Sequence, residues 1–165
     1  VSDVPWMSID LFATMAAIVG SPAPAASRPI DGRDAQAVWS CAADAKPTHD
    51  AFLFYYHDND LEAIRMGDWK LSLPRKSRTL DGKPGGDEAS ETAYVEKPVA
   101  LELFDLAADP TESHDVSAAH ADVVARAMQF VQAARADLGD ALTKQKGTGR
   151  RKPGRVEAVP AAPQK

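Results

Sequence analysis

The sequence of 165 residues contains one cysteine, Cys41, and no long hydrophobic run. A single thiol excludes an internal disulfide, and one cysteine with four histidines is too few for a structural zinc site of the CxxC type. The longest weakly polar run, residues 11–20, is short compared with the roughly twenty apolar residues that a membrane span needs. The sequence therefore predicts neither a disulfide-bonded nor a zinc-stabilised fold, and no transmembrane helix.

The GxGxxG, P-loop, HExxH and GxSxG motifs are also absent. The net charge is −5, yet residues 143–165 carry seven basic side chains and one acidic side chain, so the preceding residues are strongly acidic. This basic end has no aromatic residue, whereas nucleic-acid-binding surfaces combine clustered Lys and Arg with stacking aromatics. We therefore expect no nucleic-acid binding, and we predict that residues 143–165 are a disordered basic tail.

Hydrophobic spacing predicts one helix near each end of the chain. Apolar residues recur at helical spacing over residues 5–19, before Gly20 and Pro22, which end a helix. A second apolar stripe, containing Val123, Ala127 and Val131, predicts a helix over residues 117–138. Residues 21–50 are rich in proline and small side chains and are predicted to be a linker, with one short amphipathic turn over residues 35–39.

Four strands are predicted between these helices, at residues 51–57, 61–65, 69–73 and 101–106, because short runs of strand-forming residues alternate with turn residues. Residues 74–97 are predicted to be a long loop. A four-stranded antiparallel sheet covered by the C-terminal helix is a stable α+β unit, which we assign to residues 51–142. The helix in residues 1–20 has no place in this unit, and we expect it to belong to an α/β domain that precedes it.

Two groups of side chains suggest chemistry. His57-Asp58-Asn59-Asp60 lies at a predicted hairpin tip, where it would bind a hard cation or contact a substrate, although turn formation explains the same residues. Arg75, Lys76 and Arg78 form a cationic cluster that would contact an anion or remain solvated.

The remaining candidates are weaker. Cys41 has no basic residue near it in the sequence except Lys46, five positions on, so we interpret its thiol as inert. His49, His114 and His120 lack the spacing of metal ligands and are expected to be ordinary surface histidines.

Several segments, in the same order, resemble the C-terminal part of a sulfatase of the arylsulfatase A type. The segments are residues 3–14, residues 29–34 (Pro-Ile-Asp-Gly-Arg-Asp), residues 61–71 (Leu-Glu-Ala-Ile-Arg-Met-Gly-Asp-Trp-Lys-Leu), and residues 103–106 (Leu-Phe-Asp-Leu) with 109–112 (Asp-Pro-Thr-Glu). The resemblance covers about residues 3–135. Residues 77–86 and 119–139 are similar to sulfatases of marine, polysaccharide-degrading bacteria.

This resemblance implies a larger enzyme that hydrolyses aryl sulfates or sulfated carbohydrates. Its N-terminal α/β domain, of the alkaline-phosphatase type, would carry a calcium ion and a formylglycine nucleophile made within a C/S-x-P-x-R motif. Cys41 does not fit this motif, because Ala43 and Ala45 occupy the Pro and Arg positions. Asp58-Asn59 lies at a hairpin tip and is not transferred to the calcium site of the family. We therefore expect no catalytic residue and no metal ligand in this chain, and no sulfatase activity from it alone.

The resemblance also implies that the chain packs on its own N-terminal catalytic domain, in a periplasmic or secreted enzyme. His57, Lys76 and Arg78 are then expected to contact the sulfated substrate outside the sulfate pocket. Because the sequence begins at Val1, we expect a longer chain, with a processed N-terminus as the alternative. Two other hypotheses remain, which are a stand-alone binding module and part of a related phosphate or phosphonate ester hydrolase.

Overall fold

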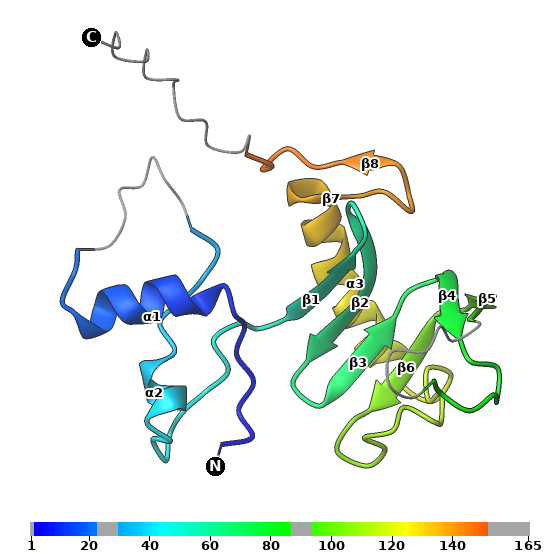
Figure 1. Cartoon of the computed structure of the whole chain (residues 1–165), viewed down its shortest axis with the longest axis horizontal. Helices are drawn as coiled ribbons and strands as arrows, with labels where there is room; N and C mark the ends of the chain where they lie inside the picture. Colours follow the sequence, from blue (N-terminus) through cyan, green and yellow to red (C-terminus); the bar gives the residue numbers. More distant parts are fainter. Residues whose placement is uncertain (1, 23–29, 87–93, 152–165) are drawn as a thin grey trace, which may run out of the picture.

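The computed structural model describes residues 2–22, 30–86 and 94–151 (Figure 1). Its elements, in chain order, are α1 (Asp10–Ile18), α2 (Gln36–Trp39), β1 (Phe52–Tyr56), β2 (Asp60–Met66), β3 (Trp69–Ser72), β4 (Arg75–Thr79), β5 (Val95–Val99), β6 (Glu102–Asp105), α3 (Ala121–Asp137), β7 (Gly139–Asp140) and β8 (Gln145–Lys146). In the described part of the chain, no helix has the length and apolar character needed to cross a membrane.

The main sheet has four antiparallel strands in the order β1-β2-β3-β6, so the predicted α+β fold is confirmed. Gly67 adopts a positive φ of 56° in the turn between β2 and β3, a conformation that glycine adopts without a steric penalty. The pairing of β1 with β2 shifts register between Phe54 and Tyr55. Such a bulge bends a strand, and here it lies close to the hairpin tip that follows β1.

The core lies between this sheet and α3, which covers one face of the sheet (Figure 1). Leu61, Ile64 and Leu103 are fully buried on the sheet side, and Ala127 and Val131 are fully buried on α3. Ala127 and Val131 belong to the predicted helical stripe, whose burial is confirmed. Leu61 and Ile64 are three residues apart and depart from strict alternation, because the register of β2 shifts between Leu61 and Ala63. The helix begins at Ala121, a few residues later than the sequence predicted.

The prediction that residues 74–97 form a loop is wrong at both ends of this segment, which form the antiparallel ribbon β4–β5. The sequence of β4 is Arg-Lys-Ser-Arg-Thr, which contains no apolar residue. Strand prediction from hydrophobic alternation therefore gives no signal here, although the described side chains alternate between half-buried and exposed. Residues 87–93 of the predicted loop lie outside the described residues.

The N-terminal helix is present but shorter than residues 5–19, and its orientation differs from that of an ordinary surface helix. Its buried side chains are Asp10 and Thr14, whereas Phe12 and Met15 are 64% and 52% exposed. The polar face of α1 packs on the segment that leads to α2, because the Thr14 hydroxyl accepts a 2.9 Å hydrogen bond from the amide of Ala35. The predicted turn over residues 35–39 is α2, and residues 23–29 of the expected linker lie outside the described residues.

The chain continues past α3 as a short hairpin in which β7 pairs with β8. Asp140 is fully buried there and accepts a 2.8 Å hydrogen bond from Arg135 Nε and a 3.0 Å hydrogen bond from the amide of Leu142. The strand Gln145–Lys146 thus lies within the segment 143–165 that the sequence predicted to be a tail. Residues 152–165 of that segment lie outside the described residues.

Candidate functional site

A cavity of about 240 Å³ brings together the three residues that the sequence singled out as substrate contacts. It lies where the β1–β2 hairpin tip, the β4–β5 ribbon and the residues after β7 meet. Its lining residues are Tyr56, His57, Asp60, Glu62, Lys76, Ser77, Arg78, Glu96 and Leu142. We call this the ribbon cavity. His57, Lys76 and Arg78 were separate candidates in the sequence, and the fold places them on one cavity.

The hairpin tip holds His57 in a defined position. His57 has a positive φ of 46°, and its imidazole ring packs edge-on against Tyr56 with the ring centroids 4.3 Å apart. Asn59 fixes the tip to the end of α3, because its side-chain amide donates a 3.1 Å hydrogen bond to the Leu138 carbonyl. The Asn59 carbonyl in turn accepts a 2.9 Å hydrogen bond from the amide of Ala141. Asn59 therefore has a structural role, which favours the turn interpretation over a cation site.

Lys76 and Arg78 are two residues apart on β4, so their exposed side chains leave the same face of the ribbon. The Arg78 guanidinium lies 4.5 Å from the centroid of the Tyr94 ring. In the described part of the chain, neither cation forms an ion pair. Both are therefore available to an anionic group of a ligand.

Arg75, the third member of the predicted cationic cluster, has a different role. Its Nη1 donates hydrogen bonds of 2.7 Å to the Ser72 hydroxyl and 3.1 Å to the Leu73 carbonyl. Its Nε lies 3.1 Å from the Glu62 carboxylate. Arg75 thus connects the start of the ribbon to β2 and β3 through these contacts, and it does not line the cavity.

Acidic side chains also line the ribbon cavity. Glu62 is engaged by Arg75, whereas Glu96 lies directly opposite Arg78 in the register of the ribbon, and Asp60 begins β2. A cavity with both signs of charge does not simply concentrate anions. It suits a ligand that carries an anionic group together with hydrogen-bond donors such as hydroxyls.

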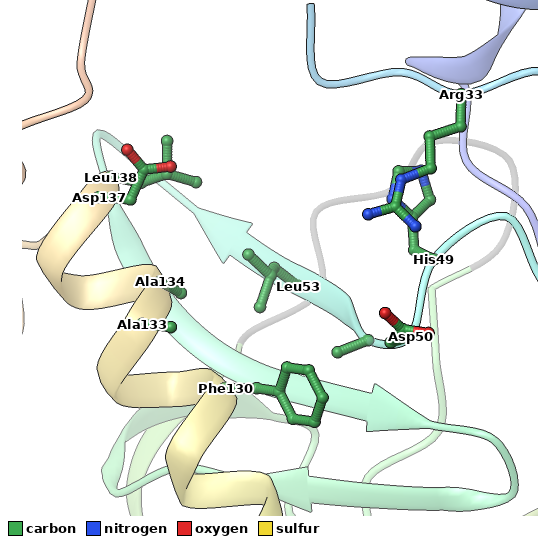
Figure 2. Close-up of a pocket in the computed structure, with 10 residues that line it drawn as sticks. Arg33, His49, Asp50, Leu53, Phe130, Ala133, Ala134, Asp137 and Leu138 are labelled. Carbon is green, nitrogen blue, oxygen red and sulfur yellow. The ribbon is translucent and has the colours of Figure 1, made fainter.

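A second cavity, of about 310 Å³, lies between α3 and the segment that leads into β1 (Figure 2). Leu53 of β1 and Phe130 of α3 point into it, and Arg33 and His49 lie on the side opposite α3. The expectation that His49 is an ordinary surface residue is wrong. Its side chain is only 12% exposed, and its Nε2 lies 2.7 Å from the buried Asp10 carboxylate. This cavity contains none of the predicted site residues and lies at the junction between the N-terminal segment and the sheet.

Tyr55, which precedes Tyr56 on β1, has a structural role. The Tyr55 hydroxyl donates a 2.9 Å hydrogen bond to the Gly139 carbonyl, and burial raises the pKa of this phenol. Cys41 is exposed. Among residues 2–22, 30–86 and 94–151, no group of three or more His, Cys, Asp or Glu side chains converges as metal ligands.

Asp60, which belongs to the predicted hairpin tip, also lines the ribbon cavity, together with Tyr56, Glu96 and Leu142, which the sequence did not mark as contacts. The alternation of β1 is a signal for Tyr56, because Phe54 and Tyr56 share the side of the strand that faces away from α3. Glu96 and Leu142 gave no such signal, since their positions depend on the ribbon and on the end of α3.

Residues 48–155 match the family model of the C-terminal region of aryl-sulfatase. A search of curated protein sequences finds no significant match. One similar solved structure is a Bacteroides thetaiotaomicron protein described in connection with the metabolism of multiple glycosaminoglycans, with 24% identity and a TM-score of 0.53 over 76% of this chain. Another is the sulfatase PsFucS1 from Pseudoalteromonas sp., with 18% identity and a TM-score of 0.55 over 75% of this chain. At these identities the structures show a shared fold, and the match covers 24% of each of those proteins.

Proposed function

The chain belongs to the family of aryl-sulfatase C-terminal regions, and from this premise we propose that it forms part of an enzyme that hydrolyses sulfate esters of aryl compounds or carbohydrates. The match over residues 48–155 carries the proposal, and the resemblance seen in the sequence is confirmed by it. The match accounts for only about a quarter of the length of the similar solved structures. The reaction therefore depends on parts of such an enzyme that these residues do not represent.

We assign no catalytic step to this chain. Nowhere in the 165 residues is there a C/S-x-P-x-R motif, so a formylglycine nucleophile would lie in the N-terminal part of the enzyme. A calcium ion does not fit the described residues either, because no group of three or more potential ligands converges there. In the proposed enzyme, both groups belong to the catalytic domain.

The proposed role of the chain is to build one side of the substrate site. His57, Lys76 and Arg78 line one cavity, and the two cations are free of carboxylate partners in the described part of the chain. They would contact the sulfated substrate outside the pocket that holds the reacting sulfate. The exposed apolar side of α1, which includes Phe12 and Met15, would pack on the catalytic domain.

The test is to express the enzyme encoded by the complete gene and to assay it with 4-nitrophenyl sulfate, 4-nitrophenyl phosphate and a phosphonate ester. We expect turnover of the sulfate ester, loss of this turnover when the nucleophile of the C/S-x-P-x-R motif is replaced by Ala, and no turnover by the 165-residue chain. Preferred hydrolysis of the phosphate or phosphonate ester would favour the related hydrolases. A gene that encodes no catalytic domain would favour a stand-alone binding module.

A further inference from the structure

Two exposed tyrosines lie beside the cations of the ribbon cavity, and neither was predicted from the sequence to contact a ligand. Tyr56 lines the cavity and is 53% exposed, although it lies within a strand of the main sheet. Tyr94 precedes β5, is 50% exposed, and lies beneath the Arg78 guanidinium. Exposed tyrosines that are held by neighbours are suited to ligand contact, because they give a large contact area at low cost in conformational entropy.

The position of Tyr56 follows from the alternation of β1. Tyr55 points toward α3, where its hydroxyl is hydrogen-bonded to the Gly139 carbonyl, so Tyr56 points to the opposite side of the sheet. There the edge-on contact with His57 supports its ring. An aromatic ring of this kind, next to polar groups of both charges, resembles a platform for a molecule with one apolar face and a polar rim.

We propose that the ribbon cavity binds one ring of an anionic sugar, with the ring stacked on Tyr56 and its sulfate or carboxylate group bound by Arg78 and Lys76. The C–H groups of a pyranose ring pack on an aromatic face, and its hydroxyls are donors for the carboxylates of Asp60 and Glu96. This inference rests on the proposed function, because it specifies which class of sulfate ester the enzyme accepts.

Two features favour a sugar over a simple aryl sulfate. The volume of about 240 Å³ is slightly below the roughly 300–1,000 Å³ that is usual for ligand pockets, which suits a single ring. An aryl sulfate has no hydroxyl groups to donate hydrogen bonds to the carboxylates of Asp60 and Glu96 after the bound ligand displaces their water.

Tyr94 has a separate role as a positioning residue. Its ring lies 4.5 Å from the Arg78 guanidinium, a geometry in which the aromatic face attracts the cation. Arg78 is thereby held over the ribbon, and among the described residues it forms no ion pair, although Glu96 lies opposite it in the ribbon. The aromatic face, and not the Tyr94 hydroxyl, is the part that matters for this role.

The first experiment measures binding of a 6-O-sulfated hexosamine disaccharide and of its unsulfated counterpart by NMR titration. The protein is the 165-residue chain with Phe12→Ser and Met15→Gln, which replace exposed apolar side chains of α1 that do not line the cavity. We expect the sulfated sugar to bind at least about tenfold more tightly, since a hydrogen bond to a charged group contributes to that extent. Tyr56→Ala and Arg78→Ala should each weaken this binding about tenfold. Phe54→Ala removes an exposed aromatic of the same strand outside the cavity, and Lys46→Ala removes an exposed cation that does not line the cavity. Both are matched controls that should retain wild-type affinity.

The second experiment tests Tyr94. Tyr94→Leu should weaken binding of the sulfated sugar severalfold, whereas Tyr94→Phe should retain it, because Phe keeps the aromatic face. If Tyr94 had only a structural role, the weaker binding of Tyr94→Leu would be accompanied by a loss of thermal stability. The thermal stability of every variant is therefore measured by circular dichroism.

The inference is overturned if the folded chain binds neither sugar, if both sugars bind equally, if inorganic sulfate at the same concentration displaces the sugar fully, or if an acidic peptide binds more tightly. It is also overturned if Tyr56→Ala binds like the wild type. Failure of the proposed function is read separately, from the turnover of 4-nitrophenyl sulfate by the complete enzyme. An enzyme that hydrolyses 4-nitrophenyl sulfate while the chain binds no sugar would retain the proposed function and reject this inference.

Discussion

His49 Nε2 lies 2.7 Å from the Asp10 carboxylate, although 39 positions separate the two residues in the sequence. Asp10 is fully buried and accepts three further hydrogen bonds, of 2.8 Å from the Arg33 amide, 2.9 Å from the Met7 amide and 2.7 Å from the Thr48 hydroxyl. A single carboxylate thus connects α1, the segment before α2 and the residues that lead into β1.

We predict that Asp10→Ala destabilises the N-terminal segment strongly. The substitution leaves buried donors without an acceptor, and we expect the free energy of unfolding to fall by about 3 kcal/mol. Hydrogen exchange should locate the effect, with faster exchange of the Arg33 amide than in the wild type. Asp44→Ala, which replaces an exposed aspartate, is the control and should have little effect. Unchanged exchange at Arg33 in Asp10→Ala would show that the carboxylate does not hold this segment.

The same carboxylate predicts an acid-sensitive contribution to stability. Burial alone raises the pKa of Asp10, but the hydrogen bonds from Arg33, Met7, Thr48 and His49 outweigh it and lower the pKa from 3.8 to about 2. The folded state therefore favours the charged form, and the stabilisation is complete above about pH 4 and is lost as the pH falls toward 2. The shift corresponds to roughly 2 kcal/mol.

Chemical denaturation of the wild type and of Asp10→Ala between pH 2 and pH 6 measures this contribution. The difference between the two unfolding free energies should shrink as the pH falls through the interval from about 4 to 2. Other carboxylates titrate in both proteins, so the difference isolates Asp10. A difference that stays constant with pH would contradict the assignment.

The hairpin tip gives a third prediction, because two neighbouring residues have different roles there. Asn59→Ala removes the hydrogen bond to the Leu138 carbonyl and should lower the free energy of unfolding by about 1 kcal/mol. Asp58→Ala should change it by less than about 0.5 kcal/mol, since Asp58 is exposed. Thermal unfolding with and without calcium completes the test. A calcium-dependent rise in the melting temperature that disappears in Asp58→Ala would restore the cation hypothesis for this tip.

Short runs of strand-forming residues between turn residues predicted the main sheet, and helical periodicity predicted α3, because burial determined both. The apolar residues of the strands face α3, and the apolar stripe of α3 faces the sheet. The sequence of each element therefore indicates which of its faces is buried. The β4–β5 ribbon was missed because Arg75, Lys76, Ser77, Arg78 and Thr79 have no apolar member, so pairing of the backbone with a distant strand is the main interaction that orders them.

The residues of the candidate site were partly predictable. His57 and the cations near residue 76 were found from residue type and from turn chemistry, but their convergence depends on the ribbon and could not be inferred. The Asp10–His49 contact was missed for a different reason. An aspartate on a helix with an apolar stripe is expected to face solvent, whereas α1 buries its polar face and exposes the apolar one.

The exposed apolar face of α1 gives a fourth prediction, for the 165-residue chain by itself. Phe12 and Met15 are more than half exposed, so the chain should bind a hydrophobic dye such as ANS and should self-associate. Phe12→Ser combined with Met15→Gln should reduce dye fluorescence severalfold while the free energy of unfolding changes little, because neither side chain contributes to the core. A chain that stays monodisperse and binds no dye would favour a stand-alone module over a surface made to pack on another domain.

The fifth prediction concerns the enzyme of which this chain is proposed to be a part. His57 and Arg78 line the ribbon cavity and would bind the substrate equally in the ground state and the transition state, since neither is proposed to touch the reacting sulfate. Loss of such uniform binding raises KM and leaves kcat almost unchanged. His57→Ala and Arg78→Ala should therefore raise KM for a sulfated sugar, about tenfold for Arg78 because it loses a charge-assisted contact, with kcat changed less than about twofold. Arg126→Ala on the exposed side of α3 is the matched control for loss of a positive charge. Steady-state kinetics with several sulfated substrates decide the point, because KM values that stay at the wild-type level on all of them would remove both residues from the substrate site.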